Sequence, residues 1–65
     1  MRIMHNGEAV EVKSDLLDAV LIELGYADAV VATAINGAFV PAPKRTETQL
    51  QAGDSLEVLA PMQGG

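Results

Sequence analysis

Polar and apolar residues interchange in two short segments near the start of the chain. They do so within residues 1–4 and again within residues 9–12, and Asn6-Gly7 stands between the two segments. Alternation with a period of two is typical of a strand that buries one face. Asn-Gly between such segments is the strongest short hairpin signal, because both residues tolerate the positive φ of a type I′ turn. The pattern predicts an N-terminal β-hairpin.

A helical repeat follows this hairpin. Within residues 16–24 the apolar side chains return at intervals of three and four, which places them on one stripe of a helix. These positions are Leu17, Val20, Leu21 and Leu24. Ser14 and Asp15 are residue types that cap helix N-termini, and Gly25 is a natural C-terminal stop. We expect one amphipathic helix of about ten residues that covers one face of a sheet.

The second half of the chain predicts another hairpin. Residues 30–35 are apolar and rich in β-branched side chains, which is typical of a buried strand. Asn36-Gly37 then repeats the hairpin signal. Residues 38–40 return as a short strand, which Pro41 ends because proline cannot donate to a ladder.

One more strand is expected after a polar loop over residues 44–50, in which Leu50 should face inward. Residues 55–60 predict this last strand, and its alternation points Leu59 away from the buried face. We expect the first and last strands to be central neighbours, because each otherwise lacks a second pairing partner. The predicted fold class is α+β, with a five-stranded mixed sheet and one main helix packed on one face.

Length and composition limit the classes of function. A chain of 65 residues makes one domain with a small core. A net charge of −5 with four basic residues cannot provide the basic face that nucleic-acid binding requires. No apolar run approaches the roughly 20 residues of a membrane span, and cysteine is absent. We therefore expect a cytoplasmic protein with neither a nucleic-acid nor a membrane partner.

The expected chemistry lies at the end of the chain, in Pro61-Met62-Gln63-Gly64-Gly65. We divide the chain into a domain over residues 1–60 and a flexible tail over residues 61–65. Gly64 and Gly65 have no Cβ, so the tail can enter a channel too narrow for other side chains. A terminal carboxylate has a pKa of about 3.3–3.7, so it is ionised and must be activated before a nucleophile attacks it. The alternative is that the two glycines are incidental, since termini often fray.

A partner that acts on this tail must also hold the body of the protein. Leu59 is the expected apolar contact at the base of the tail, and Met62, Gln63 and Gly64 continue the contact surface. Methionine suits a surface that repacks against more than one partner. Phe39 is a further candidate, although a place in the core fits it equally well.

The remaining polar residues indicate neither an enzyme active site nor a metal centre. His5 is the only histidine, and a turn residue is the better interpretation than a metal ligand. Lys44 and Arg45 fit a solvated loop better than a docking feature. The closely spaced acids have no nucleophile beside them, so helix capping and solvated faces explain them. We expect a protein that is not an enzyme and that binds no metal or cofactor itself.

Taken in order, these segments resemble the β-grasp, ubiquitin-like sulfur carriers, and most closely those of thiamine biosynthesis. The resemblance covers the whole chain and rests on the order of its motifs. These are residues 3–8 with Asn6-Gly7-Glu8, the helix at residues 14–24, residues 31–37, Val40-Pro41, residues 53–58 and Met62-Gln63-Gly64-Gly65. Many relatives carry a tryptophan in the loop after the proline, and this chain has none.

The resemblance implies a carrier. An adenylating enzyme would activate the Gly65 carboxylate with ATP, which that enzyme binds and the carrier does not. A sulfur-donor system would then convert the acyl-adenylate to a thiocarboxylate, and a thiazole synthase would use the sulfur. Gly64 would permit the narrow approach to the enzyme. Gln63, Met62, Leu59 and Phe39 would contact the partners.

Three other interpretations stay open at this point. The chain could be a molybdopterin-type or other sulfur carrier, since the same thiocarboxylate serves several acceptors. It could be a ubiquitin-like modifier that is conjugated to proteins through Gly65. It could also be a binding module without carrier chemistry.

Overall fold

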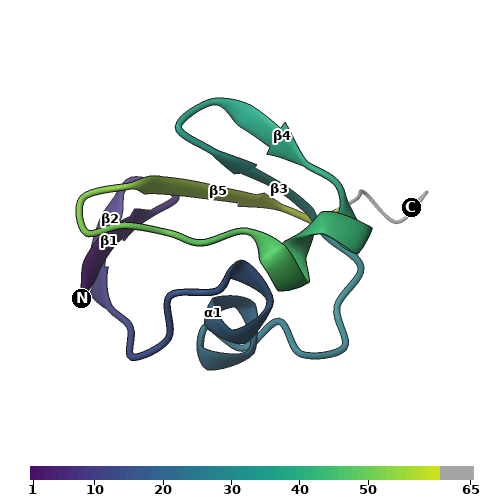
Figure 1. Ribbon diagram of the computed structural model, residues 1–65, viewed down its shortest axis with the longest axis horizontal. Coiled ribbons are helices and arrows are strands. Elements are labelled where there is room, and N and C mark those ends of the chain that lie inside the picture. The colour runs from purple at the N-terminus through teal and green to yellow at the C-terminus, as the bar shows by residue number, and fades with distance from the viewer. Residues whose placement is uncertain (61–65) are drawn as a thin grey trace.

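The computed structural model describes residues 1–60, and these form a curved sheet with a helix on one side (Figure 1). The elements are β1 (Arg2–His5), β2 (Glu8–Glu11), α1 (Leu17–Glu23), β3 (Ala32–Ile35), β4 (Ala38–Val40), the 3-10 helix η1 (Ala42–Glu47) and β5 (Ser55–Leu59). The strand order is β2-β1-β5-β3-β4. β1 and β5 are parallel neighbours and the other pairs are antiparallel, which makes the sheet mixed. The predicted fold class and the central pairing of the first and last strands are confirmed.

Both Asn-Gly pairs form the predicted turns. Asn6 and Gly7 have φ angles of 50° and 88°, and Asn36 and Gly37 have φ angles of 51° and 85°. Positive φ at both central residues is the signature of a type I′ turn, whose twist matches that of the flanking strands. The two hairpins therefore follow from local sequence.

The same two asparagines also hold β5 from either side, a role that the sequence did not reveal. The Asn6 side chain accepts from the Val58 N–H at 2.8 Å and donates to the Val58 carbonyl at 3.1 Å. The Asn36 side chain accepts from the Ser55 N–H at 2.9 Å and donates to Asp54 Oδ1 at 3.1 Å. The Asn6 amide thus pairs with the backbone of β5 as another strand would, whereas Asn36 holds the first residue of β5 and the side chain of Asp54 before it.

Replacing Asn6 by alanine is expected to lower the free energy of unfolding by roughly 2–3 kcal/mol. The substitution removes two hydrogen bonds of about 1 kcal/mol each. It also places alanine at positive φ, a conformation that asparagine tolerates better because its side chain can form local hydrogen bonds. Urea titration measures the loss. Asn6→Asp keeps the acceptor and loses the donor, so it should fall between alanine and the unmodified protein. Equal stability of all three would refute the double role of Asn6.

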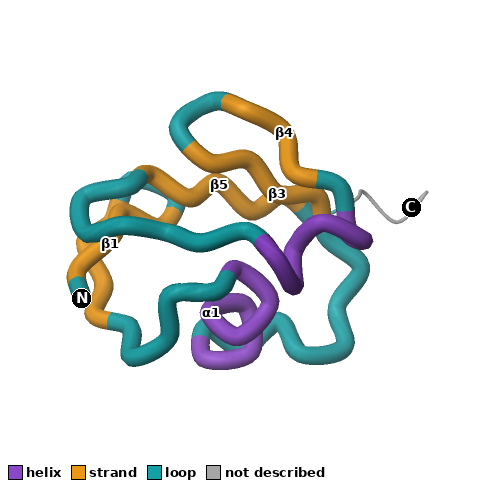
Figure 2. The backbone as a smooth tube through the Cα atoms, in the orientation of Figure 1, coloured by secondary structure: helices purple, strands orange, loops and turns teal. Residues whose placement is uncertain are grey.

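The core lies between the sheet and α1. Its buried apolar side chains come from both the sheet and the segments that cover it: Ile3, Val12, Leu17, Val20, Leu21, Leu50, Leu56 and Val58. Three of the four predicted helix-stripe residues are among them, and the fourth, Leu24, packs against them. Leu50 is 2% exposed, as expected. The η1 helix lies on the same side of the sheet as α1 and contacts it (Figure 2).

The helix begins later than the capping residues indicated. Leu16 is its N-cap and no side chain caps it, so the prediction for Ser14 and Asp15 was wrong. The reason is tertiary: Leu16 forms an antiparallel bridge with Gln49, and the Asp15 carbonyl accepts from the Leu50 N–H at 2.6 Å. The chain therefore enters α1 from an extended segment.

The far end of α1 supplies an unexpected anchor. Glu23 accepts from the N–H groups of Lys13 at 2.8 Å and Ser14 at 2.7 Å. Both hydrogen bonds stabilise the ionised form and so lower the pKa of the Glu23 carboxyl, and the bond from Lys13 has the larger effect. The carboxylate thus secures the connection that leads from β2 into the helix.

Two segments of the second half differ from expectation. The third strand begins at Ala32, and Val30 is 79% exposed, so the prediction of a buried strand from residue 30 was wrong. Most of the expected polar loop over residues 44–50 is helical, because η1 extends to Glu47. Pro41 ends β4 as predicted and then serves as the N-cap of η1.

Candidate functional site

The sheet face that turns away from α1 carries a group of exposed apolar side chains at the end of β5. In β5 the side chains alternate, with Leu56 and Val58 buried and Leu59 69% exposed. Phe39 in the edge strand β4 is also 69% exposed. The core alternative for Phe39 is therefore excluded, and the predicted exposure of Leu59 is confirmed.

The strand register brings these two residues together. Ala34 pairs with Phe39 on one side and with Glu57 on the other, and Ala32 pairs with Leu59. These five residues and Thr33 line a hollow of about 110 Å³, and the two small alanines form its floor. Small floor residues between larger walls make a shallow depression rather than a flat surface.

A second hollow continues this surface towards the end of the described chain. It has a volume of about 290 Å³ and is lined by Val30, Val31, Ala32, Leu59 and Ala60. Leu59 and Ala32 belong to both hollows. We call the apolar residues Val30, Ala32, Ala34, Phe39 and Leu59 the outer-face patch, in which Ala34 is half-buried and the other four are exposed. Apolar side chains that gather on one exposed surface mark an interaction site more often than scattered ones do.

The patch adjoins Ala60, the last residue that the structure describes. The other predicted site residues, Met62, Gln63, Gly64 and Gly65, lie outside the described residues, as does the predicted tail over residues 61–65. Of the predicted partner contacts, the structure thus brings Phe39 and Leu59 to one surface beside the point where residue 61 follows.

Sequence reasoning missed Glu57 and the two alanines of this surface. Glu57 is exposed and stands beside Ala34 on the same face as Leu59. The alternation with Leu56 and Val58 already predicted this orientation, although the pattern did not identify Glu57 as a site residue. Its position opposite Phe39 could not have been found, because it depends on the register of three strands.

His5 belongs to β1 and not to the turn, which corrects the sequence interpretation. Its Nε2 lies 2.9 Å from the hydroxyl of Tyr26, and the two rings meet edge to face at 5.6 Å. Tyr26 follows α1, so this contact joins the sheet to the connection after the helix. Within residues 1–60 no group of three or more potential metal-ligating side chains occurs.

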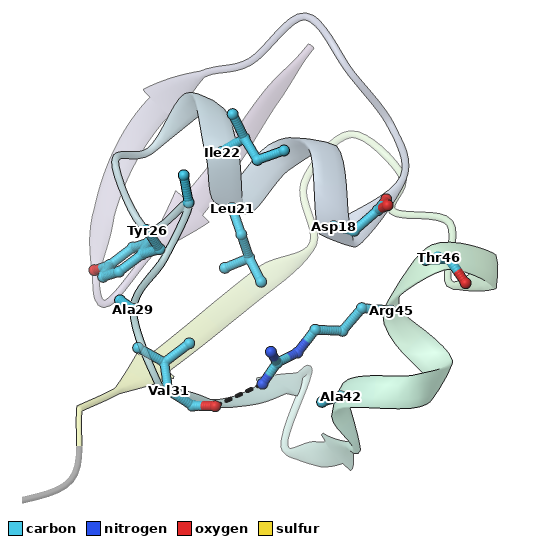
Figure 3. A pocket seen from close by; sticks show the side chains of 10 residues that line it. Asp18, Leu21, Ile22, Tyr26, Ala29, Val31, Ala42, Arg45 and Thr46 are labelled. Carbon is cyan, nitrogen blue, oxygen red and sulfur yellow. Dashed lines mark hydrogen bonds between the residues drawn. The ribbon is translucent and has the colours of Figure 1, made fainter.

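A separate groove of about 250 Å³ lies between α1 and η1 (Figure 3). Its charged groups already have structural partners. Arg45 donates to the Val31 carbonyl at 2.6 Å and to Thr33 Oγ1 at 3.2 Å, and Asp18 accepts from the Ala19 N–H at 2.8 Å. Arg45 is therefore a tertiary anchor, and its assignment to a solvated loop was wrong.

Replacing Arg45 by alanine is expected to lower the free energy of unfolding by about 2 kcal/mol, because hydrogen bonds from a charged donor are among the stronger ones. Lys44→Ala is the matched control. Lys44 is exposed, and among residues 1–60 its ammonium pairs only with Glu47, at 3.5 Å and open to solvent, so its loss should change stability by less than about 0.5 kcal/mol. Equal losses in urea titrations of the two variants would contradict the anchor role.

The region that the structure describes holds no helix with the length and apolar character to cross a membrane. The longest α-helix there, α1, has 7 residues.

Comparison with known proteins agrees with this architecture. A search of curated proteins finds no significant match. Among solved structures, the chain is similar to the crystal structure of a thiamine biosynthesis protein, ThiS, from Geobacter metallireducens. The two share 27% sequence identity with a TM-score of 0.80, and the match covers 100% of both chains. The model of the ThiS family matches residues 2–65, and the chain therefore belongs to the ThiS family.

Proposed function

We propose that this protein is a sulfur carrier of thiamine biosynthesis, which transports sulfur as a thiocarboxylate on Gly65 and does not catalyse the transfer itself. Family membership supports this proposal. So does the outer-face patch, because an enzyme that acts on residues 61–65 needs a grip on the body of the carrier close to Ala60. The patch is the observation that carries the proposal.

The chemistry begins with activation. At neutral pH the Gly65 carboxylate is ionised and a poor electrophile. Its oxygen attacks the α-phosphorus of ATP, the bond to pyrophosphate breaks, and an acyl-adenylate forms. A nucleophile at the oxidation level of sulfide then attacks the acyl carbon, AMP leaves, and the thiocarboxylate remains. Enclosure by the partner protects the adenylate from water.

The carrier supplies the reacting carboxylate and a contact surface, and its partners supply the catalysis. Gly64 and Gly65 have no side chain to obstruct enclosure, and ATP is bound by the adenylating partner. The outer-face patch is placed to dock the adenylating enzyme, and in turn the sulfur-donor system and the thiazole synthase. Leu59 and Phe39 supply apolar contact area, which is the main source of association free energy.

The intact mass of the protein tests this function after incubation with ATP, the host's adenylating enzyme and a sulfur donor. We expect a gain equal to the replacement of one oxygen by sulfur, and fragmentation should place it on Gly65. Omission of ATP is the control and should abolish the gain. An amide-linked adduct on protein lysines would instead identify a ubiquitin-like modifier. An unchanged mass with a verified enzyme would reject the carrier function.

A further inference from the structure

Glu57 is the one charged residue among the described residues that line the hollow of about 110 Å³ on the outer face. Within residues 1–60 the ion pairs join Arg2 to Glu11 and Lys44 to Glu47, so Glu57 has no cationic partner there. A carboxylate in a surface that docks a protein loses water on binding and must be compensated by a donor from the other side. A partner that covers Glu57 is therefore expected to carry a hydrogen-bond donor or a cation opposite it.

Phe39, Ala34 and Glu57 form one row across three adjacent strands. Neighbouring strands lie about 4.7–4.9 Å apart, so the aromatic ring and the carboxylate flank the alanine with roughly 9–10 Å between their backbones. The space above the alanine is thus bounded by an aromatic ring on one side and a negative charge on the other. Leu59 and Ala32 extend it along the strands.

We propose that this hollow receives one basic side chain of the enzyme that adenylates the carrier, with arginine as the best fit. The inference rests on the proposed function. The side chain's apolar stem lies over Ala32 and Ala34, its cationic head pairs with Glu57, and the ring of Phe39 stacks against that head. Glu57 and Phe39 together then determine which partner the carrier accepts.

Volume and charge both favour this occupant. The hollow of about 110 Å³ suits one long side chain, whereas sites for drug-sized ligands typically span about 300–1,000 Å³. The carrier's net charge of −5 attracts a basic partner surface over a distance. Arginine fits better than lysine, because its planar guanidinium can stack on an aromatic face while its N–H groups pair with a carboxylate.

A second copy of this chain fits the same surface poorly. In a symmetric dimer the same patch occurs on both subunits, so the patch of one copy meets that of the other. Each Glu57 carboxylate would then face the patch or the Glu57 of the other copy, and neither supplies the cation that a desolvated carboxylate needs. The hollow is therefore better suited to a basic partner than to self-association.

Titration calorimetry of the carrier with its adenylating enzyme, without ATP, tests the inference independently of sulfur transfer. We expect Glu57→Lys to weaken the Kd by roughly tenfold or more and Glu57→Gln by roughly three- to fivefold. Phe39→Leu should weaken binding about threefold, whereas Phe39→Tyr should bind as tightly as the unmodified carrier. The reason is that stacking on the cationic head requires an aromatic ring and not only apolar area. Glu57→Gln should also reduce the dependence of Kd on ionic strength.

Glu8→Lys is the matched control. It makes the same charge change at an exposed position in β2, the edge strand at the other end of the sheet. Glu57→Lys binding as tightly as Glu8→Lys would overturn the inference, and so would an unmodified carrier that does not bind the enzyme. Tight binding without a gain in mass would reject the carrier function and leave the docking inference standing. Thermal unfolding of each variant confirms that the fold is intact.

Discussion

Gly64→Val is expected to reduce thiocarboxylate formation by about 100-fold or more, the effect of misplacing a reacting group by about 1 Å. Valine adds a branched side chain one residue from the carboxylate that must reach ATP. An active site that closes around this segment to exclude water has no room for those methyl groups. The measurement is the rate of the mass gain in single-turnover reactions with excess adenylating enzyme.

Two comparisons give this result its meaning. Gly64→Ala adds one methyl group and should show an intermediate rate, so the series separates a steric effect from a general loss of activity. The urea midpoint should be the same for all three proteins, because changes near a terminus seldom affect stability. An undiminished rate for Gly64→Val would refute the narrow-channel argument.

Leu56→Ala should produce the largest change in stability, a loss of about 2–5 kcal/mol. Leu56 is 0% exposed and lies in β5, between β1 and β3. Removing its side chain leaves a cavity at the junction of both halves of the sheet. A domain of this length has a total stability of roughly 3–10 kcal/mol, so the loss should be a large fraction of the total. Urea unfolding followed by circular dichroism measures the loss.

Leu59→Ala is the matched control for this prediction. It makes the same substitution in the same strand, but Leu59 is 69% exposed, so stability should change by less than about 0.5 kcal/mol. The same variant should raise the Kd for the adenylating enzyme by roughly fivefold, because Leu59 belongs to the outer-face patch. The two leucines should thus separate folding from docking. Loss of stability at Leu59, or its retention at Leu56, would contradict the assigned faces of β5.

Much of the fold could be read from local patterns. Asn6-Gly7 and Asn36-Gly37 predict hairpins because few other residue pairs tolerate positive φ twice in succession. The repeat of three and four in α1 and the alternation in β5 indicate which side chains are buried, because each element has a fixed period. The exposure of Leu59 followed from the same alternation.

Other features depended on contacts between distant segments. Helix α1 starts at Leu17 and not at a capping side chain, because the residues before it pair with those around Gln49. The anchoring role of Arg45 depends on the tertiary structure, because the position of η1 brings its guanidinium to the Val31 carbonyl. No local pattern encodes these distances, because each joins parts of the chain that are far apart in sequence.

The candidate site divides in the same way. The carboxylate chemistry proposed for Gly65 and the steric role of Gly64 follow from residue type alone. The proposed docking surface does not, because it depends on the register of β4, β3 and β5, which aligns Phe39 with Glu57 across Ala34. Phe39 and Glu57 line one hollow although they are far apart in sequence, because the pairing between strands decides which residues share a surface.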